Sequence, residues 1–104
     1  DIGHFFPDDD PEFENASSVK LLIRVMKKIR DMGYEVGNID TTIIAQRPRL
    51  SGYIPEMKAC LSRVMGITED ALGIKATTKE KMDAIGEGKA IAVMASSLLY
   101  RRNY

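Results

Sequence analysis

The sequence has little of several features that mark particular classes of protein. Its one cysteine, Cys60, cannot form a disulfide within the chain, so a reducing compartment, by default the cytoplasm, is expected. No apolar run reaches membrane-spanning length and no charged and then apolar leader opens the chain, so neither a membrane nor export is expected. Fifteen basic residues balance fifteen acidic ones, and this net charge of zero argues against nucleic acid as a partner.

The length and the apolar content of the sequence are those of one small globular domain. The 104 residues are 44% apolar, which is ordinary for a folded protein. A domain of this size buries only a moderate share of its surface, so association with further subunits would be a natural way to bury more. We expect residues 1–104 to form a single domain.

Two stretches have the apolar spacing of amphipathic helices. Residues 17–32 carry apolar side chains at helical intervals, and Gly33 follows them as a stop signal. Residues 53–65 return to the same spacing, with Pro55 placed in the first turn, where its missing N–H costs nothing. Each stretch is expected to turn its apolar side towards the core.

Between and after these helices the sequence predicts three strands and two short helical pieces. β-Branched and apolar runs predict strands over residues 38–46, 74–77 and 90–100, the last being the longest. Thr68 followed by two acids predicts one capped helical piece, and the capping-box spacing within residues 77–80 predicts another. This order predicts an α+β fold in which helices cover one face of a sheet. Three strands make a thin sheet, which a strand from a missing segment or from another subunit would complete.

The acidic residues at the start of the chain form the first candidate site. Asp1, Asp8, Asp9 and Asp10 are close enough in sequence to bind hydroxyls or to share a hard cation. A solvated acidic loop with turns around its prolines explains the same residues without a ligand. The acids alone favour that simpler interpretation.

Two basic or hydroxyl-rich stretches are candidates for binding phosphate. In residues 45–50 a strand runs into a proline turn that carries Arg47 and Arg49, although basic turns after strands are common. In residues 75–81 a strand runs into a helix start, where backbone amides bind anions and Glu80 could hold magnesium against a diphosphate. The capping box explains the second stretch equally well.

The possible soft metal ligands do not make a zinc site. His4 and Cys60 are the only histidine and cysteine, whereas zinc needs several ligands that converge on one ion. We interpret His4 as a loop residue and Cys60 as part of the packing of the second helix.

Together the motifs resemble those of the 2-C-methyl-D-erythritol 2,4-cyclodiphosphate synthase family over nearly the whole chain. The matching motifs are Asp1-Ile2-Gly3, Phe6-Pro7-Asp8, Asp10-Pro11, GY at 33–34, GNID at 37–40, TIIAQ at 42–46, Pro48, IPEM at 54–57 and KATTKEK at 75–81. Several spaced motifs in register are far more specific than any one of them.

The resemblance implies a homotrimer with active sites between adjacent subunits. The implied substrate is 4-diphosphocytidyl-2-C-methyl-D-erythritol 2-phosphate, whose 2-phosphate attacks the nearer phosphorus of the diphosphate and expels CMP. The product is 2-C-methyl-D-erythritol 2,4-cyclodiphosphate, and the enzyme is a lyase of non-mevalonate isoprenoid biosynthesis. The alternative is a non-catalytic trimeric protein of the same fold that binds cytidine nucleotides or acts as a scaffold.

The resemblance also implies roles for individual residues. The implied substrate-binding residues are Asp1, Ile2, Gly3, Phe6, Pro7, Asp8, Asp9, Asp10, Ala45, Gln46, Arg47, Pro48, Arg49, Leu50, Ser51, Thr77, Thr78, Lys79 and Glu80. The first eight would hold the methylerythritol phosphate, and residues 45–51 would surround the cytosine and its phosphates. Thr78 would act in catalysis by steadying the transition state, while Glu80 would ligate magnesium or manganese.

Departures from the family pattern accompany the matches. Arg49 stands where the family usually has lysine, and Ala84 and Glu87 stand where it usually has phenylalanine and arginine. Family members bind zinc through an aspartate and histidines upstream of the position of Asp1, so we expect residues 1–104 to lack the N-terminal zinc-binding segment. A plastid location would require a transit peptide in that segment.

Overall fold

The fold alternates helices with the strands of one small sheet. The computed structural model describes residues 17–46, 49–78, 88 and 90–102. In chain order its elements are α2 (Ser18–Asp31), β1 (Tyr34–Ala45), the 3-10 helix η2 (Ser51–Tyr53), α3 (Ile54–Met65), the 3-10 helix η3 (Glu69–Ala71), β2 (Leu72–Thr77) and β3 (Ile91–Arg101). None of these helices is long and apolar enough to cross a membrane.

Both predicted amphipathic helices are confirmed, and local signals explain their ends. Ser17 caps α2, since its side-chain oxygen accepts a hydrogen bond from the Val19 N–H at 3.2 Å. α3 begins with proline in its first turn and ends at Gly66, whose φ of 68° lies in the left-handed region. There the Ile67 N–H donates to the Ser62 carbonyl at 3.0 Å, which satisfies a carbonyl that the helix itself leaves unpaired.

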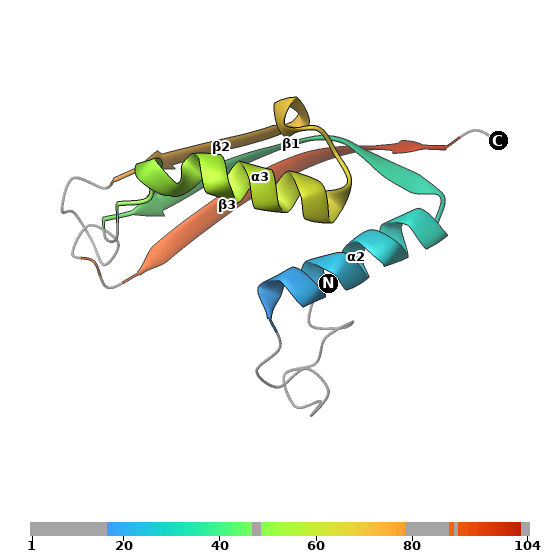
Figure 1. The fold of residues 1–104 in the computed structure, drawn as a ribbon, viewed down its shortest axis with the longest axis horizontal. Coiled ribbons are helices and arrows are strands. Elements are labelled where there is room, and N and C mark those ends of the chain that lie inside the picture. Colours follow the sequence, from blue (N-terminus) through green and yellow to red (C-terminus); the bar gives the residue numbers. More distant parts are fainter. Residues whose placement is uncertain (1–16, 47–48, 79–87, 89, 103–104) are drawn as a thin grey trace.

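The sheet has three described strands in the order β2-β1-β3. β1 pairs with β2 in parallel and with β3 antiparallel, so β1 is the central strand. Figure 1 shows α3 lying along the sheet and α2 beside it. The α+β prediction, with helices covering the sheet, is therefore confirmed.

The core lies between the two helices and the covered sheet face. Met26 of α2, Met65 of α3 and Leu72 of β2 are its most deeply buried members, at 3%, 5% and 2% exposure. Ile39 on β1 and Ile74 on β2 pack against them. Since alternate strand residues point to the same face, Thr41 and Ile43 share with Ile39 the face of β1 that is turned towards the helices.

Several predicted boundaries need correction. β1 begins at Tyr34 rather than at residue 38, and its 12 residues make it longer than the 11 of β3, which was expected to be the longest strand. A shift in the pairing register between Val36 and Asn38 accommodates Gly37, so a residue that weakens strand propensity lies inside the strand. β2 likewise begins two residues early, at Leu72.

The two predicted helical pieces have different outcomes. Residues 69–71 do form a single 3-10 turn, but the Thr68 side chain makes no capping hydrogen bond to it, so that part of the prediction is wrong. Thr77 is the last residue of β2 and Thr78 follows it without regular structure. The rest of the helix predicted to start at residue 77 lies outside the described residues.

Candidate functional site

The candidate site lies where β1 and β2 end at the same edge of the sheet. The two strands run parallel, with Ile44 of β1 opposite Thr77 of β2, and β1 ends one residue later at Ala45. Arg49, which precedes η2, and Ser51, the first residue of η2, lie back at this edge. Crevices outside the carboxyl ends of parallel strands are common ligand sites, because several connections converge there.

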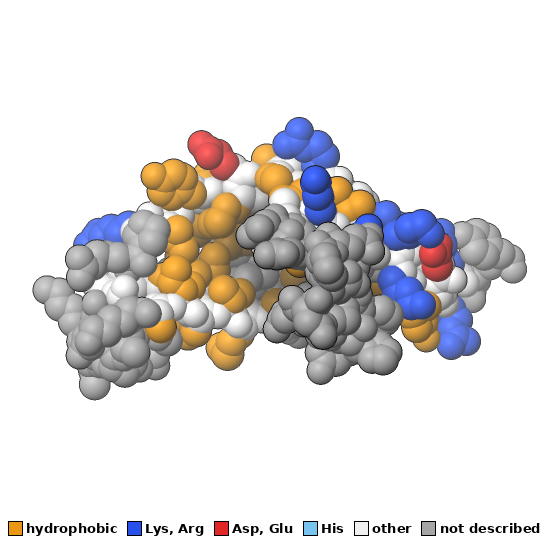
Figure 2. Space-filling view, turned by 90° about the horizontal axis from the view of Figure 1, so that it is seen from below, with side chains coloured by type: hydrophobic (Ala, Val, Ile, Leu, Met, Phe, Trp, Pro, Cys, Tyr) orange, Lys and Arg blue, Asp and Glu red, His pale blue; other side chains and the backbone are white. Residues whose placement is uncertain are grey.

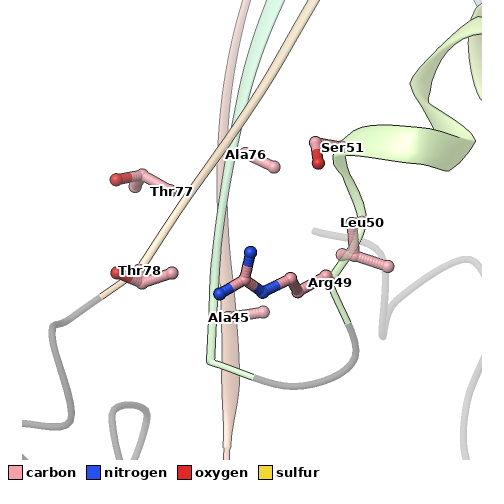
Figure 3. Close-up of a pocket in the computed structure, with 7 residues that line it drawn as sticks. All are labelled: Ala45, Arg49, Leu50, Ser51, Ala76, Thr77 and Thr78. Atoms are coloured by element: carbon pink, nitrogen blue, oxygen red, sulfur yellow. The ribbon is translucent and has the colours of Figure 1, made fainter.

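A cavity of about 200 Å³ opens at this edge. The described residues that line it are Ala45, Arg49, Leu50, Ser51, Ala76, Thr77 and Thr78. Figure 3 shows the Arg49 side chain extending from the segment before η2 towards the strand ends. Residues separated by some thirty positions in the sequence therefore share one cavity.

Small side chains keep the cavity open. Ala45 is 7% exposed at the end of β1, and Ala76 lies on the neighbouring strand opposite Ile43. A larger side chain at either position would occupy space that now lies beside the hydroxyl groups and Arg49. These two alanines thus supply the floor of the cavity rather than its chemistry.

The polar lining of the cavity suits an anion. Arg49 carries a fixed positive charge, and Ser51, Thr77 and Thr78 carry hydroxyl groups that can donate hydrogen bonds. Among the described residues of the lining, none is acidic. Arginine with hydroxyl groups is a common means of binding phosphate oxygens.

The structure brings together part of the predicted site. Six of the predicted substrate-binding residues line the cavity: Ala45, Arg49, Leu50, Ser51, Thr77 and Thr78. Gln46 is half-buried next to Ala45 but is not among the lining residues. Residues 1–3, 6–10, 47–48 and 79–80, which include the proposed metal ligand Glu80, lie outside the described residues.

Ala76 lines the cavity but was not predicted as a site residue. It lies within the motif at 75–81, whose predicted site residues are Thr77, Thr78, Lys79 and Glu80. A small residue just before the end of a parallel strand is the signal that could have identified it.

Within the described part of the chain, no group of three histidine, cysteine, aspartate or glutamate residues could hold a metal ion. Cys60 is half-buried, and it lines a separate surface hollow on α3 with Tyr53, Glu56, Met57 and Leu61. Its packing on α3 agrees with the interpretation of Cys60 as a residue of the second helix.

The sequence model of the YgbB family matches residues 1–100, which is nearly the whole chain. The chain belongs to the YgbB family. This YgbB chain is 45% identical over 103 residues to a protein of Geotalea daltonii named 2-C-methyl-D-erythritol 2,4-cyclodiphosphate synthase, and the match covers 99% of the chain and 60% of that relative. A synthase of the same name from Geobacter metallireducens is 47% identical over 102 residues. That match covers 98% of the chain and 65% of the relative.

Solved structures agree with this relationship. The structure described as "IspF (Plasmodium falciparum) CDP complex" has a TM-score of 0.84 and 34% identity, and the match covers 99% of the YgbB chain and 61% of that structure. The structure of the bifunctional IspDF from Campylobacter jejuni has a TM-score of 0.93 and 36% identity. That match covers 99% of the YgbB chain and 28% of the IspDF chain. The chain thus spans about 60 to 65% of the length of these curated relatives.

Proposed function

We propose that the chain carries out the reaction for which its relatives are named, the synthesis of 2-C-methyl-D-erythritol 2,4-cyclodiphosphate. The observation that carries the proposal is the cavity at the ends of β1 and β2, whose described lining joins Arg49 to three hydroxyl groups. That lining suits a phosphate-bearing ligand, and one similar structure is named as a CDP complex. The pathway is then non-mevalonate isoprenoid biosynthesis.

The proposed reaction is an intramolecular phosphoryl transfer. An oxygen of the substrate 2-phosphate attacks the phosphorus of the diphosphate that is nearer to methylerythritol, and the bond from that phosphorus to the bridging oxygen breaks. The electron pair leaves on CMP, and an eight-membered cyclic diphosphate remains. Such a reaction needs reactants held in line and charge neutralised on the phosphates, rather than a nucleophile from the protein.

The described residues can meet part of that need. Arg49 would neutralise phosphate charge, and the hydroxyl of Thr78 would donate a hydrogen bond to a phosphate oxygen in the transition state. Ser51 and Thr77 would add hydrogen bonds that hold the substrate in place. The backbone of residues 45–51 would surround the cytosine, with Ala45 and Ala76 leaving the room that it needs.

A homotrimer with active sites between subunits is part of the proposal. Its support is the side of β3 that faces away from the helices, where the apolar residues Met94 and Leu98 are both 63% exposed. Figure 2, which looks from below Figure 1, shows apolar side chains gathered on this side of the molecule. Exposed apolar side chains in such a group are typical of a protein interface.

Metal ions enter the proposal through residues outside the described part of the chain. Glu80 would hold magnesium or manganese against the diphosphate, where the ion would supply positive charge to the phosphate oxygens. Because the described residues contain no metal-binding group, zinc is assigned to none of them. We propose a cytoplasmic location as well.

The proposal is tested by measuring CMP release from the diphosphocytidyl substrate in the presence of magnesium and zinc. The chain is compared with the product of the longest reading frame that encodes it, and both are also assayed as Thr78→Ala variants. Turnover that falls at least tenfold in the Thr78→Ala variant is expected. Cytidine nucleotide binding without turnover in either form would instead favour a non-catalytic binding protein.

A further inference from the structure

Arg49 is the one basic side chain among the described residues that line the cavity. It follows the end of β1 by four positions, and Figure 3 shows it reaching back towards Ala45 and Thr78. Among the ion pairs of the described residues, none involves Arg49. Its positive charge is therefore not neutralised by a carboxylate of the described residues.

The shape of an arginine side chain gives this charge a preference. A guanidinium group is planar and presents parallel N–H donors, which match two oxygen atoms at once. A lysine ammonium is a compact point charge that offers no such fork. Arginine at this position therefore favours an anion that presents two oxygen atoms side by side, as two adjacent phosphates do and as a single phosphate can.

We propose that Arg49 makes nucleotide affinity depend on the second phosphate, by bridging oxygen atoms of both phosphates of a cytidine diphosphate group. This inference rests on the proposed function, because it assumes that the cavity at the strand ends is the cytidine nucleotide site. It goes further in assigning selectivity between diphosphate and monophosphate to one side chain. CMP, which keeps only one of the two phosphates, then binds more weakly than the substrate and leaves the site more readily.

The side chains around Arg49 are consistent with its role in recognising the second phosphate. Thr78 follows the last residue of β2 and Ser51 begins η2, so hydroxyl groups on two sides can hold one phosphate while the Arg49 guanidinium spans that phosphate and the next. Ala45 and Ala76 carry no polar group in their side chains, so they cannot distinguish the number of phosphates. Arg49 carries the one charge in the described lining that can respond to the charge of a second phosphate.

The test compares the affinities of cytidine, CMP and CDP by calorimetric titration, with magnesium present throughout. Arg49→Gln removes the charge, and Arg49→Lys keeps the charge but removes the fork. The matched control is Arg63→Gln, since Arg63 is also exposed but lies in the last turn of α3. Circular dichroism and thermal unfolding confirm that each variant keeps the fold.

We expect Arg49→Gln to lose only the part of the nucleotide affinity that comes from the phosphates. Arg49→Gln should weaken CDP binding by about tenfold to a hundredfold, because a hydrogen-bonded charge pair is lost, while CMP binding weakens much less and cytidine binding stays the same. The CDP affinity of Arg49→Lys should lie between those of the parent chain and Arg49→Gln. The affinities of Arg63→Gln should be the same as those of the parent chain. CDP affinity should also fall less steeply with added salt in Arg49→Gln than in the parent chain.

Other results would overturn the inference in distinguishable ways. If Arg49→Gln weakens CDP, CMP and cytidine by the same factor, Arg49 shapes the cavity rather than reading the phosphates, and the proposed function still stands. If Arg49→Lys binds CDP as tightly as the parent chain does, a positive charge alone explains the affinity for CDP, and the proposed bridging contact is wrong. If the parent chain binds none of the three nucleotides, the cytidine site fails along with the role of Arg49.

Discussion

The Arg30 guanidinium of α2 donates a hydrogen bond from Nη2 to the Met65 carbonyl of α3 at 2.8 Å. The carbonyl of Arg30 in turn accepts a hydrogen bond from Arg102 Nη2, also at 2.8 Å. The last carbonyl groups of a helix have no partner within the helix and carry partial negative charge. Two arginines thus satisfy the ends of both helices and join them to the residue that follows β3.

Removing the Arg30 side chain should loosen this corner of the molecule. We expect Arg30→Met to lower the free energy of unfolding by about 1 to 2 kcal/mol, the usual effect of losing a hydrogen bond from a charged group. Urea unfolding measures it. Arg63→Met is the control, because Arg63 is likewise a basic residue in the last turn of a helix. Equal effects of the two substitutions would show that only general helix electrostatics had been lost.

Gly66 and Arg30 should be energetically coupled. Gly66 has a φ of 68°, and a Cβ atom placed there would lie 2.8 Å from Arg30 Nη2. Gly66→Ala should therefore cost about 1 to 2 kcal/mol for the left-handed backbone, together with the displacement of the guanidinium.

A double-mutant cycle separates these two costs. In the Arg30→Met background no guanidinium has to move, so Gly66→Ala should destabilise the protein less than it does in the parent chain. Strict additivity of the two substitutions would contradict the close contact between these residues.

The sequence carried the signals for the helices because those signals are local. Ser17, Pro55 and Gly66 each lie at or beside the end that they specify. The Arg30–Met65 contact could not be predicted in this way, since it joins residues 35 positions apart. It depends on how α2 and α3 pack, which a pattern of apolar residues leaves open.

The same distinction applies to β1 and to the site. The strand was predicted to begin at residue 38, where the β-branched run starts, whereas the register shift beside Gly37 lets β1 start at Tyr34. The residues of each phosphate-binding motif were visible in the sequence, but each motif alone had a structural explanation. Only the parallel pairing of β1 with β2 places Arg49 and Thr78 on one cavity.

Tyr100 should ionise at a higher pH than an ordinary tyrosine. Its hydroxyl donates a hydrogen bond to Glu35 Oε2 at 3.0 Å across β1 and β3, and this bond, with the charge of Glu35, raises the pKa of Tyr100. Tyrosine with labelled ring carbons, followed by NMR during an alkaline titration, reports this pKa. Glu35→Gln should return it towards the ordinary value.

The sign of the effect on stability follows from that shift. Because the pKa of Tyr100 is raised in the folded state, the stabilisation is complete below the ordinary tyrosine pKa and is lost as pH rises through the folded value. The stability difference between the parent chain and Tyr100→Phe should therefore shrink at alkaline pH. A difference that grows with pH would contradict the hydrogen bond.

Leu72 should be among the most sensitive positions in the core. It is 2% exposed and packs with Met26 and Met65 where β2 meets both helices. We expect Leu72→Ala to lower the free energy of unfolding by about 2 to 5 kcal/mol, through lost burial and the cavity left behind. Leu72→Met, which keeps most of the volume, should cost less than about 1.5 kcal/mol in the same urea experiment.

The proposed trimer makes a different prediction for an apolar residue on the surface. Leu98 is 63% exposed on β3, opposite Asn38 of β1 and on the same face as Met94. If three subunits associate through this surface, Leu98→Glu would place a carboxylate in each contact, and burying an unpaired charge is costly. Sedimentation velocity should then show trimers for the parent chain and monomers for Leu98→Glu.

The control for this experiment is Val19→Glu. Val19 is also an exposed apolar residue, but it lies in the first turn of α2, where an acidic side chain is favourable. This variant should remain trimeric, which would show that added charge alone does not separate the subunits. A trimeric Leu98→Glu variant would exclude this surface of β3 from the interface, whereas a parent chain that stays monomeric at every concentration would rule out the trimer itself.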